Sequence, residues 1–445
     1  MEVTLAQMLQ AREQRVLRQT QLVRQFGRPL VSFSMNIPGP VKNTPLIQRG
    51  FRAGCRELDR KLSRVLHKEI YERVTGCEAI YVVDDAPTAI KTVTTAIEDS
   101  HGLGRLFDMD VIGTDLCKLD RETVGGGGRN CIVCGAPGRG CASRRIQSVS
   151  QLQNAVLQIL TDHFRSADAL RIGDFAVQSL LDEAETTPKP GLVDCRNSGS
   201  HRDMDIFTFR ASAAALAPYY RSCAAIGMAH QDESPDATFL RLRQEGLNAE
   251  QAMYAATGGV NTHKGAIFTL GILCGAAGRL WKADGTADIR ELFREVSAMT
   301  ASAMAEDRKK AAATAGDRLY AQYGIAGIRG EAAGGLPSVE HLGLPVFTQC
   351  LNAGMDKNRA GVDTLLHLIA RVTDTNMIHR GGMDGARAGA DACAALLARD
   401  YTLADVEALD AWFTERNLSP GGCADLLAAV YFVHALAQSD FFGKP

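Results

Sequence analysis

The sequence predicts two domains, an N-terminal α/β domain built on a mixed sheet and a C-terminal all-α domain. Its 445 residues exceed what one hydrophobic core usually serves. Helical and extended patterns alternate over residues 1–150, as they do in proteins with helix-connected strands. Alanine- and leucine-rich segments of helical period fill residues 165–445, where the strand signal nearly vanishes. We therefore place the domains at 1–150 and 165–445.

The elements of the N-terminal domain follow from local patterns. A basic amphipathic segment comes first, and short runs of β-forming residues alternate with segments of helical period. The predicted order is helix 5–24, strand 30–35, helix 46–73, strand 79–83, helix 87–100 and strand 105–112. Strands separated by helices indicate an α/β or α+β arrangement.

The C-terminal domain is predicted from long segments of helical period and length, separated by short polar, glycine-rich stretches. These helices are 152–164, 172–185, 207–225, 267–280, 289–308, 362–371, 385–399 and 403–416. Residues 231–236, around Pro235, are expected to form a surface loop.

Composition excludes several classes of protein. Hydrophobic residues make up 46% and charged residues 22% of the chain, as in globular proteins. The net charge of −2 gives no general attraction to nucleic acids or anionic membranes. No apolar run approaches the roughly 20 residues that span a bilayer, and no signal peptide follows Met1. We expect a cytoplasmic protein with twelve reduced cysteines and no nucleic-acid or membrane partner.

Residues 186–205 contain the densest group of chemically capable side chains. Two prolines force an extended path, and Gly191 and Gly199 allow tight bends. A loop that buries little and carries many polar groups seldom exists for stability. We interpret it as an active-site loop, and its candidate residues are Lys189, Asp194, Arg196, Asn197, His201, Arg202, Asp203 and Asp205.

Asp108 and Asp110 form an Asp-x-Asp pair on the predicted strand 105–112. Side chains alternate across a strand, so both carboxylates share one face. Neighbouring carboxylates repel each other unless a cation lies between them, and Mg²⁺ is the natural cation for such ligands beside phosphates. The alternative is two solvated acids on an edge strand.

A stiff turn at 36–42 follows the strand at 30–35. It presents Asn36 and Lys42 from a proline-restrained backbone, with Arg49 and Arg52 on the next helix. These cations suit a polyphosphate, although a solvated basic helix would show the same pattern.

Cys131, Cys134 and Cys141 resemble part of a zinc site. Tetrahedral zinc needs a fourth ligand, for which Cys117 is the nearest candidate in the sequence. Buried thiols beside a glycine-rich turn are the alternative.

Three further polar segments recur between helices of the C-terminal domain: 257–265, 327–331 and 374–382. Asn261 or Thr262 can cap the helix that follows the first segment, whose free N–H groups can bind phosphate. Each segment alone could be an ordinary helix end. Together they indicate a nucleotide and metal cleft, with candidate residues Asn261, His263, Lys264, Arg329, Glu331, Asp374, Asn376, His379 and Arg380.

Both halves resemble known families. Segments 186–194, 259–265, 329–331, 374–376 and 419–422 resemble, in order, the triphosphoribosyl-dephospho-CoA synthases of the CitG type. The N-terminal motifs at 31–33, 38–42, 104–110 and 131–134 are similar to the CitX-type apo-citrate lyase phosphoribosyl-dephospho-CoA transferases, which implies a nucleotidyltransferase-like domain. The chain departs from these patterns at Gln147, where a histidine is expected, and at Cys195 and Cys423.

The resemblance implies two consecutive reactions. The C-terminal domain would join ATP to 3′-dephospho-CoA with release of adenine. The N-terminal domain would transfer the phosphoribosyl-dephospho-CoA moiety to a serine of the citrate lyase acyl carrier (gamma) subunit and release pyrophosphate.

The resemblance also assigns roles. Asp203, Glu331 or Asp374 would stabilise the oxocarbenium-like ribose or deprotonate the attacking hydroxyl. Asp108 and Asp110 would hold Mg²⁺, as would Asp203 and Asp374 in the second cleft. The phosphate- and nucleotide-binding residues would be Lys42, Lys189, Asn197, His201, Asn261, His263, Lys264, Arg329, Asn376 and Arg380.

Two alternatives stay open. The same chemistry could serve a malonate decarboxylase carrier protein, or the chain could be a non-catalytic nucleotide-binding regulator.

Overall fold

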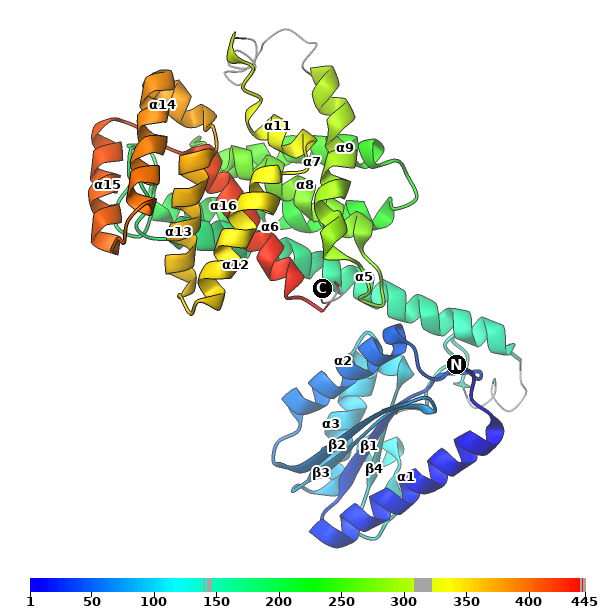
Figure 1. Cartoon of the computed structure of the whole chain (residues 1–445). Coiled ribbons are helices and arrows are strands. Elements are labelled where there is room, and N and C mark those ends of the chain that lie inside the picture. The colour runs from blue at the N-terminus through cyan, green and yellow to red at the C-terminus, as the bar shows by residue number, and fades with distance from the viewer. Residues whose placement is uncertain (139–140, 142–145, 308–321, 441, 443–445) are drawn as a thin grey trace. The chain divides into compact units, whose positions relative to one another are not determined.

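The computed structural model describes residues 1–138, 141, 146–307, 322–440 and 442 (Figure 1). The chain forms two compact units. One comprises Met1–Arg165 with Ala283–Gly285, and the other comprises Ser166–Lys282 with Thr286–Pro445.

The N-terminal unit contains a five-stranded sheet in the order β2-β3-β1-β4-β5. Its strands are β1 (Leu30–Met35), β2 (Val65–Arg73), β3 (Gly76–Val83), β4 (Phe107–Ile112) and β5 (Lys118–Leu119). Every neighbouring pair is antiparallel, so the predicted mixed sheet is wrong. The direction of a strand depends on its partner across the sheet, and local sequence pattern carries no information about that partner.

Helices cover both faces of this sheet (Figure 1). On one face, α1 (Leu5–Phe26) buries Leu22 and Val23 against Leu30, Ile80 and Val82. On the other face lie α2 (Pro45–Lys61) and α3 (Pro87–Ser100). There Phe33 of β1 stacks on Phe51 of α2, with ring centroids 5.0 Å apart.

The predicted helix 46–73 is wrong in its second half. Helix α2 ends at Lys61, Leu62 is extended, and β2 occupies Val65–Arg73. The strand lies at an edge of the sheet, and five of its nine side chains, in the runs His67–Glu69 and Glu72–Arg73, are charged or histidine. Its weak β signal is outweighed by tertiary pairing with β3.

The second unit is helical in the described residues, apart from a single bridge between Ala287 and Phe442. It contains the part of α5 (Val149–Glu185) that follows Arg165. Its other long helices are α6 (Ile206–Ala229), α7 (Pro235–Ala256), α8 (Lys264–Leu280), α9 (Leu292–Asp307), α13 (Lys357–Arg371), α14 (Thr375–Leu397), α15 (Leu403–Glu415) and α16 (Gly421–Ala437). The shorter α11 (Gly327–Ala333) and α12 (Leu344–Asn352) connect them. None of the described helices has the length and apolar character to cross a bilayer.

Most predicted helices are present, with three differences. The segments 152–164 and 172–185 belong to one helix, α5, because nothing between them breaks a helix. Helices α7, α11, α12 and α16 were not predicted, and Pro235 begins α7 at a position where its missing N–H costs nothing. The end of the predicted helix 289–308 lies outside the described residues.

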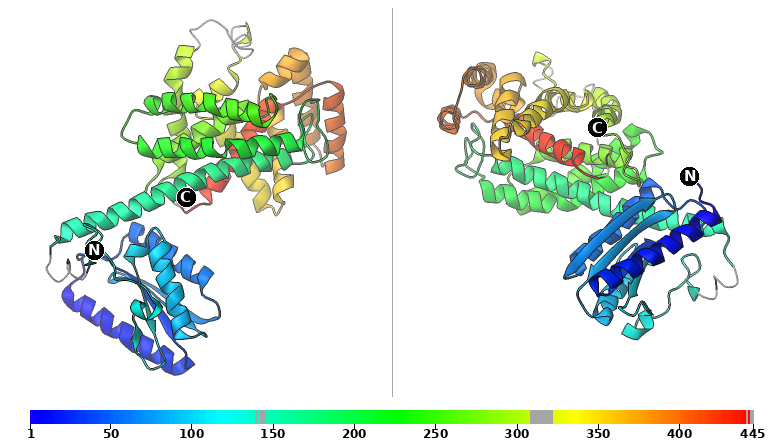
Figure 2. Two further views of the ribbon diagram at one scale, coloured as in Figure 1. Left: turned by 180° about the vertical axis from the view of Figure 1, so that it is seen from behind. Right: turned by 60° about the horizontal axis from the view of Figure 1, so that its bottom comes forward.

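Helix α16 is the centre of this unit. It contacts α8, α12, α13 and α14, and runs between the two groups of helices in Figure 1 (red). Helices α5 and α6 lie side by side (Figure 2), so closely that a Cβ at Gly173 would overlap the backbone of Arg221. A small residue such as Gly173 lets two helices pack closely. Close packing of this kind allows the polar segments between the helices to meet at one end of α16.

Candidate active site

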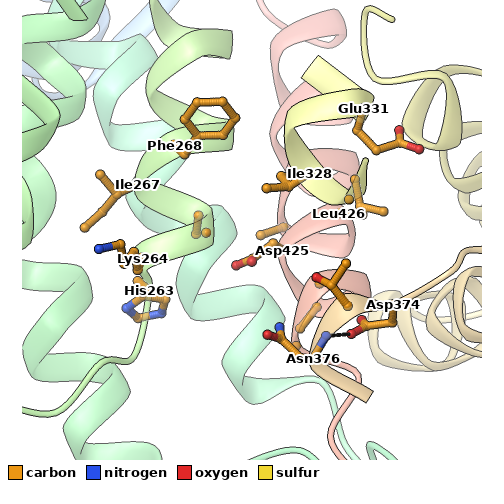
Figure 3. Close-up of a pocket in the computed structure, with 18 of the residues that line it drawn as sticks. His263, Lys264, Ile267, Phe268, Ile328, Glu331, Asp374, Asn376, Asp425 and Leu426 are labelled. Atoms are coloured by element: carbon orange, nitrogen blue, oxygen red, sulfur yellow. Dashed lines mark hydrogen bonds between the residues drawn. The ribbon is translucent and has the colours of Figure 1, made fainter. Parts of the chain in front are cut away.

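A cavity of about 1350 Å³ lies in the helical unit between α8, α11, α14 and the start of α16. Most of the residues predicted for the C-terminal site line it: Lys189, His201, Asp203, Asn261, His263, Lys264, Arg329, Glu331, Asp374, Asn376, His379 and Arg380. The candidates of the loop 186–205 that do not line it are Asp194, Arg196, Asn197, Arg202 and Asp205. Figure 3 shows His263 and Lys264 on one side, and Asp374, Asn376 and Asp425 on the other. The structure thus brings together four segments that are far apart in the sequence.

The loop 186–205 is held from within by Asp194. Its Oδ1 accepts hydrogen bonds from the N–H groups of Arg196 (2.7 Å) and Asn197 (3.0 Å), and its Oδ2 from that of Lys189 (3.1 Å). Gly191 adopts φ +69°, and a Cβ there would overlap the Leu418 carbonyl. The loop is therefore a rigid part of the cavity wall.

Lys189 is 1% exposed, and its ammonium group is committed to Glu183 of α5. The Nζ atom donates to a Glu183 carboxylate oxygen at 2.5 Å and to the Glu183 carbonyl at 2.7 Å. A lysine with these partners anchors the loop to α5, and its charge is balanced by that of Glu183.

Asn197 lies outside the cavity. Its amide donates to Asp410 at 2.8 Å, and its carbonyl oxygen accepts the N–H of Gly199 at 2.6 Å. Asp410 also accepts the N–H of Gly191 at 2.8 Å. The amide N–H of Asn197 therefore holds the loop against α15, and its carbonyl oxygen holds the bend at Gly199 within the loop.

His201 and Arg380 fasten the loop to the cavity mouth. The two ring nitrogens of His201 contact Ser419 Oγ at 2.9 Å and the Arg380 guanidinium at 3.2 Å. Arg380 also donates to the carbonyl of Ser200 and to Asn417, both at 2.9 Å. Burial, aided by the charge of Arg380, lowers the pKa of His201 to about 4, so its ring is neutral at pH 7.

His263 is 3% exposed and has one unused hydrogen-bonding atom. Its Nδ1 lies 2.7 Å from Ser212 Oγ, while its buried Nε2 has no partner. Phe209 packs edge-on against the ring. Burial, with the charge of Lys189, lowers the pKa of His263 to about 3 and keeps the imidazole neutral.

The N-terminus of α8 faces the cavity. The N-cap residue of α8 is His263, without a side-chain capping hydrogen bond, so the predicted cap at Asn261 or Thr262 is wrong. Asn261 Oδ1 accepts the N–H of Lys264 at 3.3 Å, and Thr262 donates to Ser212 at 2.8 Å. The ammonium of Lys264 pairs with Glu250 of α7 at 2.8 Å and is half exposed. A helix N-terminus beside a lysine favours an anionic ligand.

The acids Asp374 and Glu331 make extensive hydrogen bonds. Asp374 accepts the N–H groups of Asn376 (2.7 Å), Met377 (3.0 Å) and Cys423 (2.8 Å). Glu331 accepts both the N–H and the hydroxyl of Ser338, and in Figure 3 it points away from His263. These contacts join α14 to α16 and α11 to the following turn.

Asp203 differs from these acids, because it is exposed at the cavity lining. Arg329 lies on α11 and lines the same cavity.

Four acids of the cavity wall, Glu183, Glu250, Asp307 and Asp425, had not been predicted. Asp425 is the only acidic residue in α16, whose other side chains are almost all apolar. A lone carboxyl group in such a helix is a signal that could have identified it, because it must face a polar space or stay unpaired. Glu183 ends a long amphipathic helix and resembles any surface acid in the sequence.

In the N-terminal unit, Asp108 and Asp110 share one face of β4, as predicted. They lie opposite Ser34 and Ser32 of β1, respectively. Lys118 pairs with Asp110 at 2.6 Å. Burial, followed by the charge of Asp110, raises the pKa of Asp108, which indicates a site that would gain from an added cation.

The predicted cations near 36–52 are already partnered. Lys42 Nζ donates to the Ile37 carbonyl at 2.5 Å, and Arg52 forms two hydrogen bonds with Glu72 at 2.8 and 2.9 Å. Arg49 is buried and stacks over the ring of Phe164 at 4.1 Å. The contacts of Lys42, Arg49 and Arg52 thus stabilise the N-terminal unit.

Cys131, Cys134 and Cys141 meet, with their sulfur atoms within 4.8 Å of one another. The N–H of Cys131 bonds to the Ala136 carbonyl at 2.7 Å, and Gly135 (φ +71°) donates to the Cys131 carbonyl at 3.0 Å. Cys117 is not part of this group. Nearby N–H groups lower the pKa of Cys131 to about 7.

The fold and the cavity define a transferase with a helical nucleotide-handling domain, and comparison with known proteins agrees. A model of the CitG family, ATP:dephospho-CoA triphosphoribosyl transferase, matches residues 169–441. A model of the CitX family, apo-citrate lyase phosphoribosyl-dephospho-CoA transferase, matches residues 3–163. The chain therefore belongs to the CitG family and carries a CitX domain before it, so it is an enzyme with two transferase domains.

Relatives with both domains cover almost the whole chain. Protein CitXG of Haemophilus influenzae is 33% identical over 451 residues, which covers 97% of this chain and 96% of the relative. Protein CitXG of Leuconostoc mesenteroides subsp. cremoris is 32% identical over 461 residues, with 98% of each chain covered. A probable 2-(5''-triphosphoribosyl)-3'-dephosphocoenzyme-A synthase of Vibrio cholerae is 42% identical over 277 residues, 60% of this chain and 88% of its own.

Proposed function

We propose that this chain makes and attaches the prosthetic group of citrate lyase. The C-terminal domain joins ATP to 3′-dephospho-CoA and releases adenine. The N-terminal domain transfers the phosphoribosyl-dephospho-CoA moiety to a serine of the acyl carrier (gamma) subunit and releases pyrophosphate. The observation that carries the proposal is the convergence of the CitG-like segments on one cavity, together with near-complete coverage by CitXG relatives.

The cavity suits the first reaction. Lys264 and the N-terminus of α8 offer positive potential to a triphosphate, and Arg329 lines the same space. Breaking the bond to adenine builds positive charge on the ribose, which carboxylates stabilise. Asp203 is the exposed carboxylate for this or for a phosphate-bound Mg²⁺, whereas the hydrogen bonds of Asp374 and Glu331 assign them to shaping the cavity.

The second reaction is assigned to the face of β4. Asp108 and Asp110 would hold Mg²⁺, which would supply positive charge at the phosphate under attack. Their position on an interior strand supports a nucleotidyltransferase-like role for a domain that we place at 1–150, with the synthase domain at 165–445.

A direct experiment tests both reactions. The purified protein is incubated with ATP, 3′-dephospho-CoA and the apo acyl carrier of citrate lyase, and intact carrier mass and released adenine are measured. We expect adenine release that needs dephospho-CoA and a carrier mass gain equal to one phosphoribosyl-dephospho-CoA. Modification of a malonate decarboxylase carrier in its place would change the assigned partner. Absence of adenine release would contradict the synthase assignment.

The three-cysteine cluster is a further part of the proposal, as a structural zinc site. The backbone hydrogen bonds that surround Cys131 and Gly135 fold the CxxC segment into a tight turn that faces its sulfurs toward Cys141. Zinc binds thiolate at about 2.3 Å in tetrahedral sites, which suits sulfurs this close together.

The zinc content of the protein tests this part. We expect about one zinc per chain by elemental analysis, lost in Cys134→Ser and kept in Cys117→Ser, whose thiol lies outside the cluster. Equal zinc content in both variants would contradict the site.

A further inference from the structure

Asp425 is a carboxyl group of the cavity wall for which the residue pattern suggested no function. It projects from the first turns of α16 across the cavity. In Figure 3 its carboxylate points toward the start of α8, where Lys264 lies. A Cβ at Gly265 would overlap its carboxylate. The side chain therefore touches the backbone at the N-terminus of α8, which only glycine permits at this position.

The neighbouring acids are neutralised or fully hydrogen-bonded, and Asp425 is not. Glu183 pairs with Lys189 at 2.5 Å, and Asp374 accepts three N–H groups. Among the described residues, no lysine or arginine forms an ion pair with Asp425, which meets the N–H of Ala266. Unlike Glu183 and Asp374, Asp425 is therefore not held in its ionised form by a cation or by several N–H groups.

The surroundings of Asp425 increase its affinity for a proton. Burial comes first, and the charges of Glu183 and Asp374 add to it, so the pKa of Asp425 is raised well above its usual value. The N–H of Ala266 opposes the shift and does not cancel it. A carboxyl group with a raised pKa is a stronger base when ionised, which suits a group that takes up a proton and returns it.

A second, independent observation indicates a ligand beside it. The Nε2 atom of His263 is buried in the cavity wall and has no hydrogen-bond partner. Thr262 donates to Ser212 Oγ at 2.8 Å, which leaves the Ser212 hydroxyl hydrogen for His263 Nδ1 at 2.7 Å. The neutral ring then carries its proton on Nε2, as a donor without an acceptor until a ligand supplies one.

We propose that Asp425 is the catalytic carboxyl group that moves the proton during adenine displacement. This inference rests on the proposed synthase activity. The carboxylate takes the proton of the 2′-hydroxyl of dephospho-CoA as the oxygen bonds to C1′ of the ATP ribose. The C1′–N9 bond breaks, its electron pair stays on adenine, and Asp425 returns the proton to the departing base. Atoms and charge balance without a further reactant.

Asp425→Asn tests the proposal, because the amide oxygen can still accept the N–H of Ala266 while the proton carrier is lost. We expect kcat for adenine release to fall about 100-fold or more, the usual contribution of general acid–base catalysis, with the Kd for ATP within threefold of wild type. The matched control is Asp391→Asn, an exposed acid of α14, which should keep full activity. A kcat within threefold of wild type in Asp425→Asn would overturn the proposal.

A second measurement does not depend on how the variant folds. In the wild type, log kcat should fall with unit slope as the pH drops below a pKa that lies above the usual aspartate value of about 3.9. A kcat that stays constant down to the acid limit of folding would overturn the role of Asp425. If the wild type releases no adenine at all, the proposed synthase activity fails instead, so the two failures are distinguishable.

Discussion

Lys189 shows how one residue of the active-site loop combines structure and charge. In the sequence it was a candidate phosphate-binding residue. In the structure it is buried against Glu183 and joins the loop to α5. Whether it also attracts phosphate through its charge stays a prediction, but its contribution to stability follows directly from the burial of the pair.

We predict that Lys189→Met lowers the free energy of unfolding of the helical unit by about 3–5 kcal/mol, because it leaves the Glu183 charge buried and unpaired. Both tryptophans, Trp281 and Trp412, lie in this unit, so urea titration followed by tryptophan fluorescence measures it. The control is Arg210→Met, which breaks an exposed pair with Glu185 and should cost less than about 1 kcal/mol. Equal effects would contradict the assignment.

The buried histidines predict loss of stability in acid. Their folded pKa values, about 4 for His201 and about 3 for His263, lie below the unfolded value of about 6.5. Between these values the unfolded chain binds more protons, so stability is complete above about pH 6.5 and falls as the pH is lowered. Each histidine contributes a slope of up to about 1.4 kcal/mol per pH unit.

We expect His263→Gln to reduce this slope between pH 6.5 and 4.5, measured by urea titrations at several pH values. The carboxyl groups with raised pKa, such as Asp374, are common to both proteins and cancel in the comparison. His341→Gln, which replaces an exposed histidine, should leave the slope unchanged. Parallel curves for His263→Gln and wild type would contradict the pKa assignment.

At the scale of elements, the helices were predictable where an apolar stripe repeats with helical period. Helix α16 was missed because it is apolar nearly all round, and β2 because it is a charged edge strand. In both, burial or pairing with distant segments outweighs local pattern. The cap of α8 was placed wrongly at Asn261 or Thr262, because the helix begins after His263, and the sequence pattern does not fix a helix start to the residue.

The crossing of α6 and α8 depends on small residues. A Cβ at Gly278 would overlap the Ala224 carbonyl of α6. We predict that Gly278→Ala lowers the free energy of unfolding by about 1–3 kcal/mol through overpacking. Gly246→Ala on α7 is the control, since its Cβ would lie 3.6 Å from the nearest atom, and helix propensity should make it neutral or stabilising by up to about 1 kcal/mol. A larger loss of unfolding free energy in Gly246→Ala than in Gly278→Ala would contradict this account of the packing.

At the scale of the whole molecule, the two activities are assigned to separate compact units. We predict that Asp108→Asn abolishes carrier modification and retains adenine release. Asp374→Ala should do the opposite, because it removes the acceptor of three N–H groups that shape the cavity. Adenine assay and carrier mass spectrometry measure the two activities.

Mixing the two variants tests the independence of the sites. If the intermediate diffuses freely, an equimolar mixture restores carrier modification. If the mixture does not restore carrier modification, Asp374→Ala is supplied with added intermediate as a control. Carrier modification in that control would show that the intermediate normally passes between the two sites of one chain. Loss of both activities in Asp108→Asn would contradict the assignment to separate sites.

The sequence by itself determined the division into a sheet-containing and a helical part, the polar segments, and the residue types that are predicted to handle phosphate and proton. These features depend on neighbours along the chain. Only the tertiary structure decided which residues face the cavity. It assigned Asn197 to support the loop, committed Lys189 to Glu183, and placed Asp425 beside the N-terminus of α8. The physical reason is that burial and hydrogen-bond partners depend on how the folded chain brings segments together, as with Asn197 and Asp410, 213 positions apart, and a local pattern does not record this.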